Sequence, residues 1–166
     1  PRVVGSLTQG LAQLGHHVTL ATTDACDGRS RLGAPSLSAA GPADAANGCF
    51  SAANGVALRV FPNLSNLAAY HLQAFLPIGL RRFLRREVRR FDIAHLHGCH
   101  NLPGALAAAA LHAAGVPFVV SPNGTAPIFE RRLAAKRLFE RAGGWRVLTW
   151  ADRVLAVSGA EARQFR

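Results

Sequence analysis

The sequence predicts an α/β fold in which a mostly parallel sheet is covered by helices on both faces. Apolar, β-branched runs alternate with helical patterns along the chain, and those runs are continuously apolar, as in strands that are buried on both faces. Of the 166 residues, 49% are hydrophobic, which is enough for one domain with its own core. We therefore expect residues 1–166 to form a single domain.

Each element is predicted from its local pattern. Residues 3–14 place apolar side chains at helical spacing, and Gly15 is expected to end that helix because glycine readily adopts the left-handed conformation. Residues 23–54 are rich in Gly, Ala, Ser and Pro, which predicts a long loop. The other expected elements are a strand at 17–22, a strand at 56–61, a helix over 72–90 with a kink or restart at Pro77, a strand at 92–97, a helix at 103–114, a strand at 118–121, one helix or two over 129–150, a strand at 153–158 and a final helix from 159.

Composition excludes several classes of protein. Lys and Arg number 19 against 9 Asp and Glu, a net charge of +10, but charged residues are only 17% of the chain, so a disordered chain is excluded. Three widely spaced cysteines do not suit a disulfide framework and favour a reducing compartment. We expect a cytoplasmic protein, with a peripheral location at the inner face of the membrane as a further option.

Pro and Gly interrupt the uncharged stretch 93–129, so no transmembrane helix is expected there. The basic and apolar segments of a signal peptide are not seen either.

Polar residues follow the predicted strands at the points where those strands end. In an open parallel sheet, ligands bind beyond the carboxyl ends of the strands, so these residues are candidates for the floor of a cleft. They are small, polar and interrupted by glycine, which lets backbone N–H groups face a ligand, although ordinary turns use the same residue types. The candidates are 22–24, 97–101, 121–125 and Ser158.

A group of potential metal ligands, His95, His97, Cys99 and His100, lies within this set. We expect no metal there, because structural zinc sites combine ligand pairs from separate segments; partly buried, hydrogen-bonded histidines are the alternative. The sequence also has no Gly-x-Ser-x-Gly elbow, Gly-x-Gly-x-x-Gly loop or Walker-type loop. No catalytic residue is assigned from these patterns.

The positive charge is concentrated in residues 81–90, which hold six Arg and one Glu. On a helix these arginines fill one half of the surface and apolar side chains fill the other. The arginine face is either an ordinary solvated face or a contact for anionic lipid head groups or an anionic substrate, for which the candidates are Arg82, Arg86 and Arg89. We do not expect nucleic acid as the partner, because the helix carries no Tyr or Trp for base stacking.

Four stretches together resemble a known family. They read LTQGLAQLGHHVTLATTD, FDIAHLHG, AAGVPFVVSPNGTAP and ADRVLAVSGAEARQF. Their order and spacing resemble the N-terminal domain of GT-B glycosyltransferases of the retaining, family 4-like type. Each stretch alone is mostly helix, glycine and apolar strand, but all four in order are fairly specific, and the resemblance covers nearly the whole chain except 23–54.

The resemblance implies a Rossmann-like, three-layer α/β/α domain that is one half of a GT-B fold and binds the acceptor. A second Rossmann-like domain would bind a nucleotide-sugar donor; that domain, and the strand and glycine-rich loop that precede the opening helix in the family, are expected outside this sequence. The implied reaction is transfer of a hexosyl group, with retention and without a required metal ion, to a glycan or lipid-linked acceptor, as in polysaccharide biosynthesis. The isolated chain is expected to be inactive.

The resemblance also points to particular residues. His97 and Gly98 match one cleft turn of the family, and Gly124 and Thr125 match another, although His97 and Gly124 could equally serve only the turns themselves. The family often has Ser-Pro-His-Gly-Thr where this chain has Asn123 in place of the histidine. Asparagine hydrogen-bonds but takes no proton near neutral pH, so Asn123 is expected to bind substrate rather than to catalyse. Asn101 and Ser158 complete the expected substrate-binding set.

One alternative comes from a different functional class. The Arg-rich helix is also the feature expected of a non-catalytic α/β module that binds an anionic partner, either a membrane surface or a nucleic acid.

Overall fold

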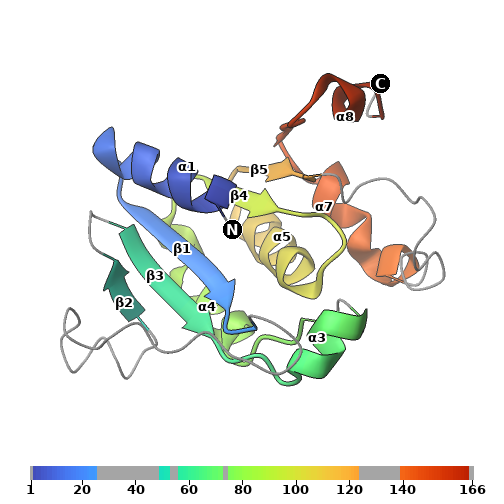
Figure 1. Ribbon diagram of the computed structural model, residues 1–166, viewed down its shortest axis with the longest axis horizontal. Helices are drawn as coiled ribbons and strands as arrows, with labels where there is room; N and C mark the ends of the chain where they lie inside the picture. Colours follow the sequence, from blue (N-terminus) through green and yellow to red (C-terminus); the bar gives the residue numbers. More distant parts are fainter. Residues whose placement is uncertain (1, 26–48, 53–55, 73–74, 124–138, 165–166) are drawn as a thin grey trace. The chain divides into compact units, whose positions relative to one another are not determined.

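The computed structural model describes residues 2–25, 49–52, 56–72, 75–123 and 139–164 (Figure 1). Helices and mainly parallel strands alternate along the chain, which confirms the predicted α/β class. The contacts divide the chain into two compact units, Pro1–Leu72 and Gln73–Arg166. Each unit has its own three-stranded sheet and is described by itself.

The first unit contains a sheet in which β3 is the central strand. β1 and β3 run parallel, with Val18 level with Val56, while β2 and β3 run antiparallel. β2 lies inside the range predicted to be a loop. Its short sequence, CFSA, has little strand signal of its own, and the backbone hydrogen bonds of β3 determine its conformation. The elements of this unit are α1 (Arg2–Gln13), β1 (Val18–Thr23), β2 (Cys49–Ala52), β3 (Val56–Phe61) and α3 (Asn66–Leu72).

Two turns of the first unit show why its elements end where they do. Gly15 adopts a φ of 89° just after α1, and its N–H donates to the Ala12 carbonyl, as predicted for the end of this helix. Beyond β3, the buried Asn63 donates its backbone N–H to the carboxylate of Asp24 at 2.7 Å. The Ser65 hydroxyl then accepts from Ala68 N–H at 3.2 Å and caps the start of α3.

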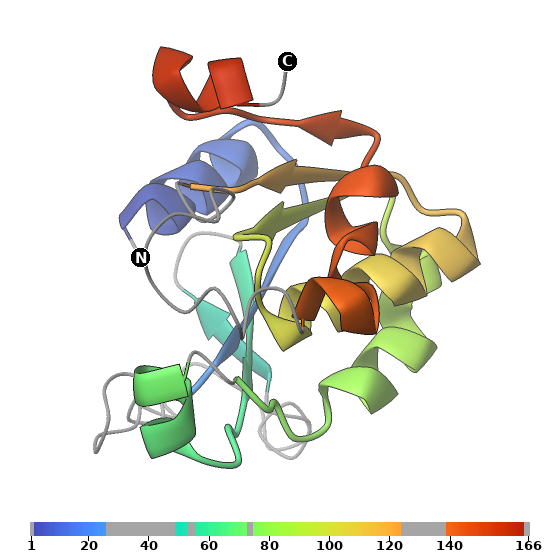
Figure 2. The ribbon, with the colours of Figure 1, turned by 90° about the vertical axis from the view of Figure 1, so that its right-hand side faces the viewer.

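The second unit contains a fully parallel sheet in the order β4-β5-β6 (Figure 2). The predicted helix over 72–90 is in fact split, because Gly79, with a φ of 87°, precedes a new helix that begins at Leu80. The elements are α4 (Leu80–Glu87), η2 (Val88–Arg90), β4 (Ala94–His97), α5 (Leu102–Ala114), β5 (Phe118–Ser121), η3 (Glu140–Gly144), α7 (Arg146–Thr149), β6 (Arg153–Val154) and α8 (Gly159–Gln164).

β6 is shorter than predicted. β6 was expected over 153–158 but ends at Val154; its partner β5 is followed by Pro122, which has no N–H to continue the ladder. The one helix or two predicted over 129–150 are described from residue 139 onward, where Gly143, with a non-helical φ of 105°, separates two short helices.

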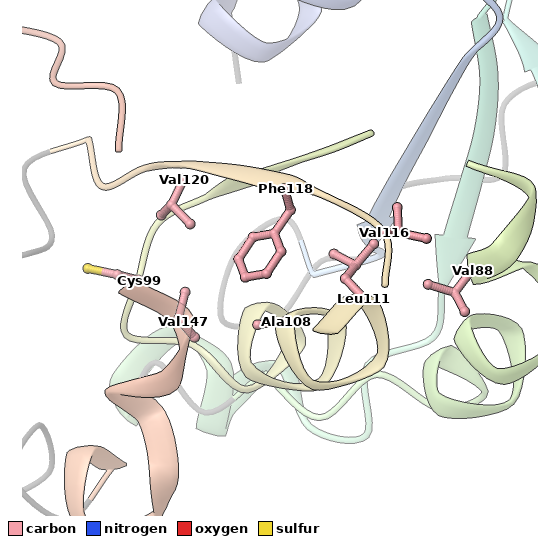
Figure 3. Close-up of a cluster of buried hydrophobic side chains, with 8 residues drawn as sticks. All are labelled: Val88, Cys99, Ala108, Leu111, Val116, Phe118, Val120 and Val147. Carbon is pink, nitrogen blue, oxygen red and sulfur yellow. The ribbon is translucent and has the colours of Figure 1, made fainter. Parts of the chain in front are cut away.

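The core of the second unit lies between the sheet and helices α5 and α7. Phe118 and Val120 on β5 point toward Ala108 of α5 and Val147 of α7 (Figure 3), and Phe118 is only 1% exposed. Leu96 and Ala94 of β4 pack against the same cluster. Because side chains alternate along a strand, His95 and His97 point to the opposite face of the sheet.

An aromatic contact also joins α5 to Trp150, the residue that follows α7. The rings of His112 and Trp150 stack with centroids 4.2 Å apart and an interplanar angle of 5°. The Arg146 guanidinium lies over the Trp150 ring at 5.3 Å, so this side of the unit is held by stacking and cation–π attraction.

Candidate functional site

The carboxyl ends of β4 and β5 lie side by side in the second unit. The two strands are parallel, and His97 is level with Ser121. The Gly98 N–H donates to the Ser121 carbonyl at 2.8 Å, which ties the turn after β4 to the end of β5. Gly98 has a φ of 78°, a conformation that glycine adopts without a steric penalty. The turns after β4 and β5 therefore start at the same edge of the sheet, as the sequence predicted.

Two histidines of β4 share the face opposite α5. Their rings are stacked, with centroids 4.1 Å apart and an interplanar angle of 29°. Nε2 of His95 also lies 2.8 Å from the Ser121 hydroxyl oxygen. The sequence offered two interpretations of His95, a metal ligand or a partly buried, hydrogen-bonded histidine, and its contact with Ser121 fits the second.

Asn123 completes the contact between the two turns. It has a φ of 53°, in the left-handed region where Asn is enriched among non-glycine residues. Its side-chain Nδ2 donates to the Ser121 carbonyl at 3.0 Å and lies 3.4 Å from Nδ1 of His97. His95, His97, Ser121 and Asn123 form what we call the histidine cluster.

The surroundings of the histidine cluster disfavour positive charge. Burial lowers the pKa of His95, and the neighbouring His97 lowers it further. Burial likewise lowers the pKa of the His97 imidazole, because a charged ring loses solvation there. Both rings are therefore neutral near pH 7, which leaves each with one nitrogen that donates and one that accepts a hydrogen bond.

A second polar chain begins at the next residue of the β4–α5 turn. Sγ of Cys99 lies 3.3 Å from Nδ1 of His100, and Nε2 of His100 lies 3.0 Å from the Glu140 carboxylate. Nucleophile, base and orienting carboxylate occur in this order in cysteine hydrolases, but Cys99 is only 2% exposed and belongs to the hydrophobic core. The arrangement therefore anchors the turn to η3 and offers no nucleophile to a substrate. Glu140 was not found by sequence reasoning, since nothing local pairs it with His100.

Among the residues that the structure describes, no group of three or more His, Cys, Asp or Glu side chains is arranged to hold a metal ion. Within those same ranges, no helix is long and apolar enough to cross a membrane.

Two of the expected substrate-binding residues cap helices. The Asn101 side chain accepts from Gly104 N–H at 2.6 Å at the start of α5. The Ser158 hydroxyl accepts from Glu161 N–H at 3.1 Å ahead of α8, and the Glu161 carboxylate accepts from Val157 N–H. Both residues follow strands of the parallel sheet, but these side-chain oxygens already have a donor. Gly124 and Thr125 lie outside the described residues.

The Arg-rich helix has the amphipathic character that the sequence predicted. Leu80 and Leu84 of α4 and Val88 of η2 are buried, whereas the arginines are exposed. Arg90 pairs with Glu87 at 2.7 Å, but Arg82, Arg86 and Arg89 form no ion pair within the described part of the chain. Three arginines, Arg82, Arg85 and Arg86, line an open hollow of about 440 Å³.

The second unit has a parallel sheet with polar residues at its carboxyl edge, the edge at which open α/β sheets generally bind ligands. The family model for Glycosyltransferase Family 4 matches residues 1–166, the full length of the sequence. The chain belongs to this family of glycosyltransferases. A comparison with curated proteins gave no match.

Proposed function

We propose that this chain is the acceptor-binding domain of a retaining glycosyltransferase that transfers a hexosyl group to a glycan or lipid-linked acceptor. The observation that carries the proposal is the family match over residues 1–166, combined with the histidine cluster at the carboxyl edge of β4 and β5. That edge is where ligands bind in open parallel sheets.

In this proposal the cluster positions the acceptor rather than breaking bonds. The acceptor oxygen bonds to the anomeric carbon of the donor, the bond from that carbon to the diphosphate breaks, and the diphosphate leaves with the electron pair and the hydroxyl proton. Holding the two reactants in a productive geometry can lower the barrier by about 7–11 kcal/mol. His97 and Asn123 present hydrogen-bonding groups for this purpose, while Gly98, whose N–H is already bonded, shapes the turn. Gly124 and Thr125 belong to the same proposed surface.

The nucleotide-sugar donor is assigned to a second Rossmann-like domain, and the reaction requires no metal ion. This assignment follows from the resemblance to the GT-B family. The 166-residue chain alone is accordingly proposed to transfer no sugar.

Two measurements on the purified chain test the proposal. With a panel of nucleotide-hexoses and alkyl hexosides, we expect no release of nucleoside diphosphate, and turnover would contradict the assignment of the donor site to another domain. In ¹H–¹⁵N spectra, alkyl hexosides are expected to shift the signals of His97 and Asn123. The shifts should be lost in Asn123→Ala and kept in His16→Gln, an exposed change in the turn after α1. Shifts confined to other residues would place the acceptor elsewhere.

A second candidate function is supported by α4. Arg82 and Arg86, which are exposed beside the hollow and form no ion pair with any described residue, suit a negatively charged surface. We therefore also propose peripheral contact with an anionic membrane, compatible with a lipid-linked acceptor and a cytoplasmic location. The chain should sediment with phosphatidylglycerol vesicles but not with phosphatidylcholine vesicles, and less so as salt rises. Arg82→Glu with Arg86→Glu and Arg89→Glu should abolish binding; equal binding by this variant would contradict the contact.

A further inference from the structure

The histidine cluster forms a closed circuit of contacts. The ring of His95 stacks on that of His97 and its Nε2 meets the Ser121 hydroxyl. The Ser121 carbonyl accepts from Asn123 Nδ2, which in turn reaches Nδ1 of His97. The side chains of His95, His97 and Asn123 are thus each held from two directions, so the orientation of one constrains the others.

The circuit determines which atom of the Asn123 amide faces which partner. The Ser121 carbonyl oxygen can only accept, so the amide nitrogen must face it, since the amide oxygen would repel it. One hydrogen of the NH₂ group is directed to this carbonyl at 3.0 Å, and the other is the one directed toward His97 at 3.4 Å. Nδ1 of His97 is therefore an acceptor, and the proton of the neutral ring lies on Nε2.

The same face of the sheet carries no carboxylate on the three strands that would favour a protonated ring. His95 is level with Val119, and Val119 is level with Arg153; paired residues point to the same face. Within β4, β5 and β6, the titratable or charged side chains on this face are therefore His95, His97 and Arg153. All three are cationic when protonated, and no carboxylate of these strands opposes them.

We propose that His95 and Ser121 are positioning residues for His97, which together with Asn123 hold its imidazole neutral with Nδ1 as acceptor and Nε2–H as the donor offered to a ligand oxygen. The ligand is the acceptor of the function proposed above, so the inference rests on that proposal for its purpose. The orientation and tautomer of the His97 ring do not depend on that proposed function. In this role His97 binds an oxygen lone pair and takes no proton from the acceptor.

Nuclear magnetic resonance of the 166-residue chain, labelled with ¹⁵N-histidine, tests the inference without a ligand. Long-range ¹H–¹⁵N spectra distinguish the two tautomers of each ring, and a pH titration gives the protonation midpoint of His97. We expect the Nε2–H tautomer in the unaltered chain and a mixture of tautomers in Asn123→Ala. A dominant Nδ1–H tautomer in the unaltered chain would overturn the inference.

Variants of His95 separate a positioning role from a structural one. His95→Ala exposes the His97 ring and should raise its protonation midpoint by about half a pH unit or more. His95→Phe supplies a ring in the same place and should restore the low midpoint, while His16→Gln, an exposed change in the turn after α1, should leave it unchanged. If His95→Ala does not fold, Ser121→Ala provides the test. Loss of the contact between the Ser121 hydroxyl and His95 should raise the protonation midpoint of His97 by a smaller amount. An unchanged midpoint in the folded variant would refute the role of His95 and Ser121 and leave the sugar-transfer proposal standing.

Discussion

Phe118 and Asp152 exchange two hydrogen bonds between β5 and the start of β6. The Asp152 N–H donates to the Phe118 carbonyl at 2.9 Å, and the Phe118 N–H donates to the Asp152 carboxylate at 2.8 Å. Phe118, whose N–H is the second of these donors, is one of the most buried residues of the second unit. This pair sets the register of the last strand and satisfies a backbone group that has no access to water.

Removing the Asp152 carboxylate should destabilise the protein. We expect Asp152→Ala to lower the free energy of unfolding by about 1.5–3 kcal/mol, because a buried N–H loses a charged acceptor. Asp152→Asn should lose less, since the amide oxygen still accepts. Urea unfolding measures both changes, and Asp92→Ala, an exposed change ahead of β4, provides the control. Equal stability of Asp152→Ala and the parent chain would contradict the importance of the pair.

The amide of Asn101 should matter for stability through its cap. Asn101→Ala should cost about 0.5–2 kcal/mol, as is usual for the loss of an N-cap, because Gly104 N–H loses its acceptor. Asn101→Ser should retain most of the stability, since a hydroxyl caps equally well. Thermal unfolding of the three proteins checks this. If the serine variant loses as much stability as the alanine variant, the amide has a structural role beyond capping.

Gly98 should tolerate asparagine better than alanine. Its φ of 78° places a Cβ in an unfavourable position, so Gly98→Ala should cost about 1–2 kcal/mol. Gly98→Asn should cost less, because Asn is enriched in the left-handed region. Urea unfolding curves give the comparison, and the reverse order of stability would be inconsistent with this backbone conformation.

Stability should fall as the pH is lowered below about 6.5, the value of an ordinary histidine. Burial lowers the pKa of His95 and His97 in the folded state, so the unfolded chain binds more protons in this range. The free energy of unfolding therefore keeps its full value above the pKa of the histidines in the unfolded chain. It decreases as the pH falls toward their lower pKa values in the folded protein. Melting temperatures measured from pH 7.5 to pH 5 should show this decline.

A double variant provides the control for the pH dependence. His95→Phe with His97→Phe removes both titrating rings while keeping two aromatic side chains on the strand. Its melting temperature should change less over the same pH range than that of the parent chain. An unchanged slope would assign the pH dependence to other groups.

Much of the fold could be predicted because the pattern and the tertiary structure agree. β3 and β5 occupy the predicted residues 56–61 and 118–121, since their apolar, β-branched sequences suit only a buried strand. β2 could not be predicted, because its pairing with β3 comes from a partner strand rather than from its own sequence. The split of the helix over 72–90 was indicated only by Pro77, while Gly79 sets the start of α4.

The candidate site was predictable in its location but not in its contacts. Parallel strands bring their carboxyl ends to one edge, which places His97 near Asn123 without any knowledge of the loops. Stacking of His95 on His97 and the bond of His100 to Glu140 depend on side-chain rotamers and on packing of η3. No local pattern in the sequence encodes either contact.

The parallel register of β4 and β5 has a consequence for how the protein tolerates change. The spacing between His97 and Asn123 is set by the ladder that makes His97 level with Ser121, not by the length of the helix connecting the two strands. A crossover lengthened or shortened at its far end, near Gly115, would leave the histidine cluster in place. The length of the connection between β4 and β5 can therefore vary while the spacing of His97 and Asn123 stays the same.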